Sequence, residues 1–181
     1  IGQLNNHGFS LLELLVVMAI IVIVSTITAV GLNVLAEGNA KKANKTMYSK
    51  ISELRTTTMS KSGEWYMVIS CQDNTYTLET HHVANGEDNI KDTSKFSASR
   101  ISLNYYNGDS STGYDLRNNS LKIQFNKNDG SCKSVKIIDT EEFITDNLDS
   151  PQFGKIVASV SRNNTYESKL WYKTGRVTTQ N

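Results

Sequence analysis

Proline, cysteine and early positive charge are the scarce features of this sequence. A single proline, Pro151, occurs among 181 residues, so long helices and strands can run without the break that an internal proline causes. The two cysteines, Cys71 and Cys132, form no Cys-x-x-Cys pair, which argues against a metal site built from cysteines. No lysine or arginine occurs before Lys41. The first part of the chain is therefore chemically unlike the rest.

Common catalytic patterns are also missing. The net charge is +1, from 19 basic and 18 acidic residues, so no overall field favours an acidic substrate. The histidines are His7, His81 and His82, and neighbours on a strand point to opposite faces, so the adjacent pair does not make a two-ligand metal site. No phosphate-binding glycine loop, nucleophile elbow or zinc-protease motif is present. We therefore expect a protein that is not an enzyme, with no catalytic residue, metal or cofactor.

What the sequence does contain is a long apolar run near its start. Leu11–Val30 supplies about 20 mostly apolar residues, the number that a helix needs to cross a bilayer core of ~30 Å. From Phe9 to Ala36 the only ionisable side chain is that of Glu13. A carboxylate at the bilayer centre costs roughly 2.5–3.5 kcal/mol, so Glu13 needs a nearby interface or a partner. We predict that this segment spans a membrane at some stage.

The residues around Glu13 carry a family resemblance. Gly8-Phe9-Ser10-Leu11-Leu12-Glu13, running directly into the apolar segment, resembles the cleavage and methylation signal of type IV pilins and pseudopilins. The resemblance implies that a prepilin peptidase cuts after Gly8 and that Phe9 becomes the N-methylated mature N-terminus. It also implies that Glu13, the fifth mature residue, neutralises the N-terminal ammonium of a neighbouring pilin or pseudopilin subunit. The chain would be a single-pass protein of the cell membrane with an extracytoplasmic C-terminal domain, and later part of a surface filament.

An ordinary secretory signal is the alternative interpretation of this segment. Its small-residue cleavage site follows the apolar region, and Ala29-Val30-Gly31 fits that pattern. This interpretation leaves Glu13 without a role.

The helical pattern continues beyond the apolar run. Small or apolar residues recur three or four positions apart as far as Lys61, with basic residues between them, which predicts one apolar and one basic face. The sequence thus predicts one helix of about 50 residues, ended by Ser62-Gly63. The predicted divisions are a leader over 1–8, a transmembrane and filament-core helix over 9–36, its amphipathic continuation over 37–61 and a β-rich globular domain over 62–181.

Beyond the helix, the sequence predicts about seven or eight short strands separated by turns. Hairpins are expected at Gln72-Asp73-Asn74 and at Asn128-Asp129-Gly130. The polar stretch Val83–Arg100 is predicted to be a surface loop, and Glu141–Asn147 a helical turn. Without βαβ alternation or repeats, the predicted class is α+β, a long helix packed against an antiparallel sheet or sandwich, as in the pilin fold.

The cysteines leave two alternatives open. If the domain lies outside the membrane, Cys71 and Cys132 could form one disulfide, and the competing possibility is two buried free thiols.

The end of the chain is locally basic. From Lys155 onward, five basic residues occur with Glu167 as the one acidic residue, whereas residues 60–154 hold nine basic and fourteen acidic ones. Such a patch is typical of a phosphate-contacting surface, which makes Lys173 and Arg176 candidate DNA contacts. The alternative is that Gly175 forms a hairpin turn and Arg176 pairs with a neighbouring carboxylate.

The order of parts carries a second, narrower resemblance. Lys122–Gly130 and Lys173-Thr174-Gly175-Arg176-Val177 are similar to segments of the H-type pseudopilins of type II secretion and of the minor pilins of DNA-uptake pili. Two classes of function follow: a structural subunit of a filament, or a membrane-anchored or filament-tip module whose β domain binds a ligand or nucleic acid.

Overall fold

The computed structural model describes residues 10–140, 142–143, 152–161 and 164–180, with side chains for all of these except 26–33, 142–143 and 161. The chain forms two compact units, Ile1–Leu35 and Ala36–Asn181.

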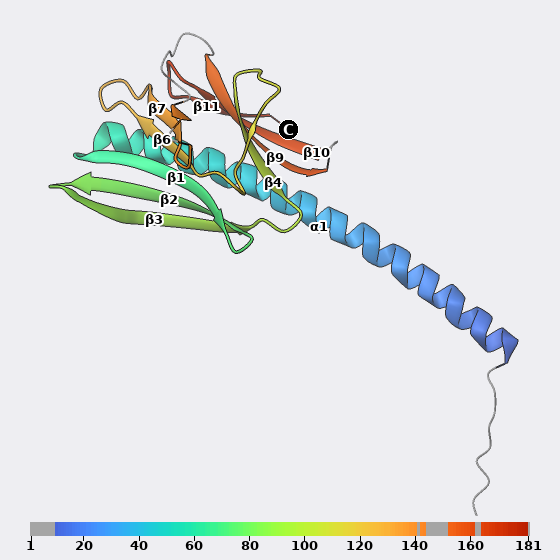
Figure 1. Cartoon of the computed structure of the whole chain (residues 1–181). Coiled ribbons are helices and arrows are strands. Elements are labelled where there is room, and N and C mark those ends of the chain that lie inside the picture. The colour runs from blue at the N-terminus through green and yellow to red at the C-terminus, as the bar shows by residue number, and fades with distance from the viewer. Residues whose placement is uncertain (1–9, 141, 144–151, 162–163, 181) are drawn as a thin grey trace, which may run out of the picture. The chain divides into compact units, whose positions relative to one another are not determined.

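One helix, α1 (Leu11–Ser60), occupies 50 residues, which confirms the predicted length (Figure 1). It begins after Ser10, whose carbonyl accepts a hydrogen bond from the amide of Leu14 at 3.1 Å. It ends at Ser60, just before the predicted Ser62-Gly63 signal, where Gly63 has a φ of +82°.

The first unit has no core of its own among its described side chains. The large apolar residues from Leu11 to Val24 are exposed by 47% to 83%, on every side of the helix. A helix that is apolar all round is normally covered by lipid or by other protein. Within the part of the chain that the structure describes, no helix meets the length and hydropathy needed to cross a membrane.

In the second unit, α1 has the two faces that the sequence predicts. Its basic face carries Lys41, Lys42 and Lys45, which are exposed. Its opposite face is buried and follows the three-and-four spacing of a core-facing helix. The buried residues of this face are Ala36, Ala40, Ala43, Asn44, Met47, Ile51, Leu54 and Thr58.

Two antiparallel sheets complete the second unit, which makes the fold α+β as predicted. One has the strand order β3-β2-β1-β6-β7-β8 and the other β11-β10-β9-β4-β5. Strands of both sheets lie along the second half of α1, and residues from the helix and both sheets form one apolar core (Figure 1). The described strands are β1 (Glu64–Gln72), β2 (Thr75–Ala84), β3 (Glu87–Ser97), β4 (Ser102–Asn107), β5 (Tyr114–Asp115), β6 (Leu121–Phe125), β7 (Cys132–Ile137), β8 (Glu142–Phe143), β9 (Phe153–Ser161), β10 (Asn164–Trp171) and β11 (Val177–Gln180).

Both predicted hairpins are confirmed. β1 and β2 pair in register across a two-residue turn, Asp73-Asn74, with φ values of +47° and +56°. Positive φ at both central residues is the geometry that matches the twist of paired strands, and Asn and Asp tolerate it. β6 and β7 pair across the turn that contains Gly130.

The surface loop predicted over Val83–Arg100 is wrong, because β3 occupies most of this stretch. β3 pairs along its whole length with β2 at the edge of the sheet. An edge strand needs little apolar alternation, and charged residues on it oppose edge-to-edge aggregation. Phe96 packs against the core, and Asp92 forms an ion pair with Lys50 of α1 at 3.0 Å.

The helical turn predicted over Glu141–Asn147 is also wrong where the structure describes it. Glu142 and Phe143 form β8, which pairs with β7. Pairing with β7 gives these residues backbone hydrogen bonds, whereas a single isolated turn of helix is unfavourable. The remaining residues of that prediction lie outside the described part of the chain.

Truncation of the buried face of α1 should destabilise the second unit. Ile51 is 1% exposed and lies in the shared core, so Ile51→Ala should lower the free energy of unfolding by about 2–5 kcal/mol. Urea unfolding of the full chain in a non-ionic detergent, followed by circular dichroism, measures this change. Ser49→Ala, on the exposed face of the same helix, should change it by about 0.5 kcal/mol or less. Equal effects of the two substitutions would contradict the assigned faces.

Candidate functional site

At the N-terminal end, Glu13 lies in the first turn of α1 and bonds to the start of the helix. Its Oε2 accepts a hydrogen bond from the backbone amide of Ser10 at 2.9 Å, and its own amide donates to Ser10 Oγ at 3.2 Å. This reciprocal pair is a capping box, which satisfies two backbone donors that a helix start leaves open. Gly8 and Phe9, the predicted cleavage and methylation residues, lie outside the described residues.

The capping box was not predicted, although its signal is present in the sequence. Ser10 stands three positions before Glu13, and serine followed by glutamate at that spacing, just before an apolar run, is typical of a helix start. The carboxylate also lies at the positive end of the helix dipole. Because Glu13 is exposed and a carboxylate has about four acceptor positions, it can take a further donor from another molecule.

The two cysteines are free thiols in the structure, Cys71 half-buried and Cys132 buried. β6 lies between β1 and β7, so the two cysteines stand on strands separated by about 10 Å. Cys132 is opposite Phe125 at one end of β6, and Cys71 lies beyond Ile69, which pairs with Leu121 at the other end. A disulfide needs Cα atoms within roughly 7 Å, which this arrangement does not provide.

His81 and His82 point to opposite faces of β2, as predicted. His82 stacks on Trp65 with ring centroids 4.2 Å apart, and His81 stacks on Tyr66 at 4.6 Å. His81 Nδ1 also lies 3.1 Å from a carboxylate oxygen of Asp88. The hydrogen bond that Tyr66 donates to Asp88 lowers the pKa of that carboxyl group, with a smaller contribution from His81. Among the described residues, no cluster of histidine, cysteine or acidic side chains could hold a metal ion.

At the C-terminal end, the turn between β10 and β11 is tightly fixed. The amide of Gly175 donates to the carbonyl of Trp171 at 2.7 Å, and the amide of Trp171 donates to the carbonyl of Arg176 at 2.8 Å. Gly175 has a φ of +61° and is so close to the turn at Gly130 that a Cβ would overlap the carbonyl oxygen of Gly130. Arg55 of α1 donates to that same oxygen at 2.9 Å. Gly175 therefore forms a hairpin turn, as the alternative interpretation of the basic C-terminal segment predicts.

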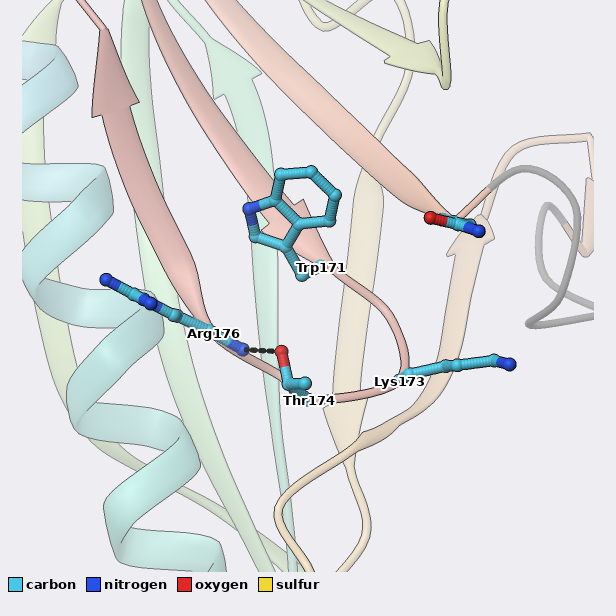
Figure 2. A pocket seen from close by; sticks show the side chains of 5 residues that line it. Trp171, Lys173, Thr174 and Arg176 are labelled. Carbon is cyan, nitrogen blue, oxygen red and sulfur yellow. Dashed lines mark hydrogen bonds between the residues drawn. The ribbon is translucent and has the colours of Figure 1, made fainter.

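A hollow of about 380 Å³ opens at this turn. Figure 2 shows Lys173 and Arg176 on either side of Thr174, extending in opposite directions, with the indole of Trp171 between them. Both cationic side chains are exposed. The residues that line the hollow are Gln152, Trp171, Lys173, Thr174 and Arg176.

Arg176 differs from other basic residues of the C-terminal segment. Lys155 lies 3.8 Å from Asp109, and Lys169 lies 3.2 Å from Glu167. Within the described part of the chain, the guanidinium of Arg176 has no carboxylate at ion-pair distance, so the predicted alternative of a paired Arg176 is not observed there. The hollow therefore carries exposed positive charge beside an aromatic ring.

Comparison with known proteins bears on the N-terminal segment. Residues 3–29 match the family model described as the prokaryotic N-terminal methylation motif. A comparison with curated proteins and one with solved structures each returned no match. The matched residues include Gly8, Phe9 and Glu13, so the motif supports a type IV pilin-like or pseudopilin-like subunit. Such a motif implies processing by a prepilin peptidase and assembly with other pilins.

The state of the cysteines can be tested by counting thiols. Burial raises the pKa of Cys132 to about 12 and raises the pKa of Cys71 above its ordinary value. Because the thiolate is the reactive form, native protein at pH 8 should react slowly at Cys71 and not measurably at Cys132. In denaturant without reductant, two thiols should react, as measured by mass spectrometry after alkylation. A count of zero would show a disulfide and overturn the free-thiol arrangement.

Proposed function

We propose that this chain is a minor pilin or pseudopilin, a structural subunit of a type IV pilus or of a type II secretion-like filament. The observation that carries the proposal is the exposed apolar stretch Leu11–Val24, which lies within the matched methylation motif. Apolar surface of this extent needs a cover from another molecule. Lipid supplies that cover before assembly, and the helices of neighbouring subunits supply it in the filament.

The proposed subunit begins as a single-pass protein of the cell membrane with its C-terminal domain on the extracytoplasmic side. A prepilin peptidase cuts after Gly8, and Phe9 becomes the methylated N-terminus. Residues 9–36 then form the filament-core helix, 37–61 its amphipathic continuation and 62–181 the globular domain, while 1–8 is the removed leader. The narrower resemblance, carried by Lys122–Gly130 and by residues 173–177, supports an H-type minor pseudopilin or a DNA-uptake minor pilin as the subtype.

Glu13 is the proposed assembly residue. Cleavage after Gly8 creates a new ammonium group at Phe9, and a neighbouring subunit would bring that ammonium to the carboxylate of Glu13. An ammonium or a carboxylate alone among apolar helices is unfavourable, whereas the pair offsets much of the desolvation penalty. The exposed carboxylate, fixed by Ser10 at the first turn of α1, supports this role.

A second candidate function is a binding module, at the membrane or at a filament tip, that uses the C-terminal β domain for DNA uptake or adhesion. The hollow beside Trp171 and Arg176 favours this candidate, because it joins exposed positive charge to an aromatic ring. The two functions are compatible in one filament subunit.

Removal of the Glu13 charge should block assembly. Glutamine also serves in capping boxes, so Glu13→Gln keeps the helix start while it removes the carboxylate that neutralises a neighbour's ammonium. We expect folded, membrane-inserted and cleaved protein that does not enter filaments. Immunoblotting of sheared filament fractions against membrane fractions measures incorporation.

The matched control separates charge from helix capping. Ser10→Ala removes the hydroxyl acceptor of the Glu13 amide and leaves the carboxylate in place. It should cost the helix start about 1 kcal/mol and leave incorporation largely intact. Incorporation of Glu13→Gln at the wild-type level would rule out the proposed charge pairing.

Cleavage after Gly8 should depend on the absence of a side chain at that position. Gly8→Val should leave the leader attached, because the peptidase must accept the residue before the scissile bond. Intact-mass spectrometry should find the wild-type protein without residues 1–8 and with one methyl group on Phe9. The control Gly2→Val changes a leader residue, so the mature mass should stay the same. A Gly8→Val protein with the wild-type mature mass would show that cleavage does not depend on glycine at position 8.

A further inference from the structure

We propose that the hollow at the β10–β11 turn is a binding site for single-stranded nucleic acid. One base stacks on the indole of Trp171, and the phosphates on either side contact Arg176 and Lys173. This inference names the ligand class for the binding module proposed above and rests on that second candidate function. It does not depend on assembly through Glu13.

The indole of Trp171 is held as a platform. Its Nε1 donates to Thr178 Oγ1 of β11 at 3.3 Å, and its ring packs at a tilt against Phe153 with centroids 5.2 Å apart. Trp171 is half-buried and lines the hollow, whereas the second tryptophan, Trp65, is only 6% exposed. A fixed and partly open indole is the kind of surface on which an unpaired base stacks.

The backbone that carries the cations is also fixed before any ligand binds. The amide of Arg176 donates to Thr174 Oγ1 at 3.2 Å, as Figure 2 shows, and Gly175 lies against the neighbouring turn at Gly130. Little conformational entropy of the backbone is then lost when the turn binds a ligand.

The placement of the charges favours a chain-like ligand over a small anion. Lys173 and Arg176 extend in opposite directions from the turn, so they do not converge on one phosphate (Figure 2). A ligand with repeated negative charges can contact both cations at once, with a ring between them. Single-stranded nucleic acid has this alternation of phosphates and flat rings, and its bases are free to leave the stack.

A duplex fits this surface poorly. Its bases are paired and stacked, so the indole would contact no ring face, and two cations alone would give weak and sequence-independent contact with phosphates. An acidic polysaccharide has the charges but no aromatic rings. The contribution of Trp171 therefore distinguishes single-stranded nucleic acid from other polyanions.

The test is a titration of the full chain, in a non-ionic detergent, with a thymidine oligomer of about 12 nucleotides. Binding should quench tryptophan fluorescence, and the signal should come from Trp171 because Trp65 is buried. Trp171→Ala should weaken binding, measured by anisotropy of a labelled oligomer, by about 5- to 100-fold, whereas Trp171→Phe should retain most of it. Thermal unfolding of both variants shows whether the fold is intact, and the Phe variant keeps the test valid if the Ala variant unfolds.

The salt dependence tests the cations separately. Two phosphate contacts to a single strand predict a slope of about −1.4 for log K against log salt, and Arg176→Ala should reduce its magnitude by about 0.7. Lys95→Ala, which removes an exposed charge from β3 of the other sheet, should leave the slope unchanged.

Three results would overturn the proposal: no salt-sensitive binding, equal affinity for a duplex of the same length, or equal affinity for heparin with no loss in Trp171→Ala. These results do not bear on the proposed role in filament assembly, which two variants test separately. Trp171→Ala should enter filaments normally, and Glu13→Gln should bind the oligomer as the wild type does.

Discussion

Both sheets pack against the same buried stripe of α1, and the globular unit depends on this contact. The stripe runs from Ala36 to Thr58 at helical spacing, and each sheet contributes alternate residues to the core around it. Without the helix, the inner faces of the two sheets would lose the surface that covers them. The β-rich domain is therefore incomplete without the second half of α1, even though the sequence suggests a boundary near Gly63.

Polar contacts fix how the helix sits against each sheet in this unit. On one side, Ser168 of β10 donates to Asn44 at 2.6 Å, and both residues are buried. Tyr166 of the same strand donates to Glu37 at 3.0 Å. On the other side, Arg55 bonds to the β6–β7 turn. A buried hydrogen bond is lost if the helix slides by one residue, so these contacts select one register where apolar packing alone would tolerate several.

The N-terminal motif could be recognised in the sequence because its residues are consecutive in the chain. A cleavage signal, an apolar run and Glu13 at a fixed offset are all visible without knowledge of the fold. The helix length and the α+β class also followed from local patterns, namely a helical period, two turn signals and a glycine stop. The capping role of Ser10 also has a local signal, the serine three positions before a glutamate, but the same Glu13 fits the methylation motif without it.

The C-terminal hollow shows why other features could not be predicted in full. Lys173 and Arg176 were identified from charge, but the hollow also needs Gln152, which lies far away in the sequence. The close contact of Gly175 with Gly130 joins hairpins of two different sheets and has no local pattern. β3 was missed for a related reason, since pairing with β2 makes it a strand while its own residues are mostly polar.

The contact between Gly175 and Gly130 has a consequence for how this surface can diversify. Any side chain at Gly175 would overlap the neighbouring turn and is excluded by shape, so the geometry of the β10–β11 turn is held constant. Lys173 and Arg176, on either side of Thr174, are exposed. The backbone of the turn is thus fixed by its contact with Gly130, and the exposed side chains beside it take no part in that contact. Substitution of the exposed side chains can therefore change the charge of this surface while the turn beneath stays the same.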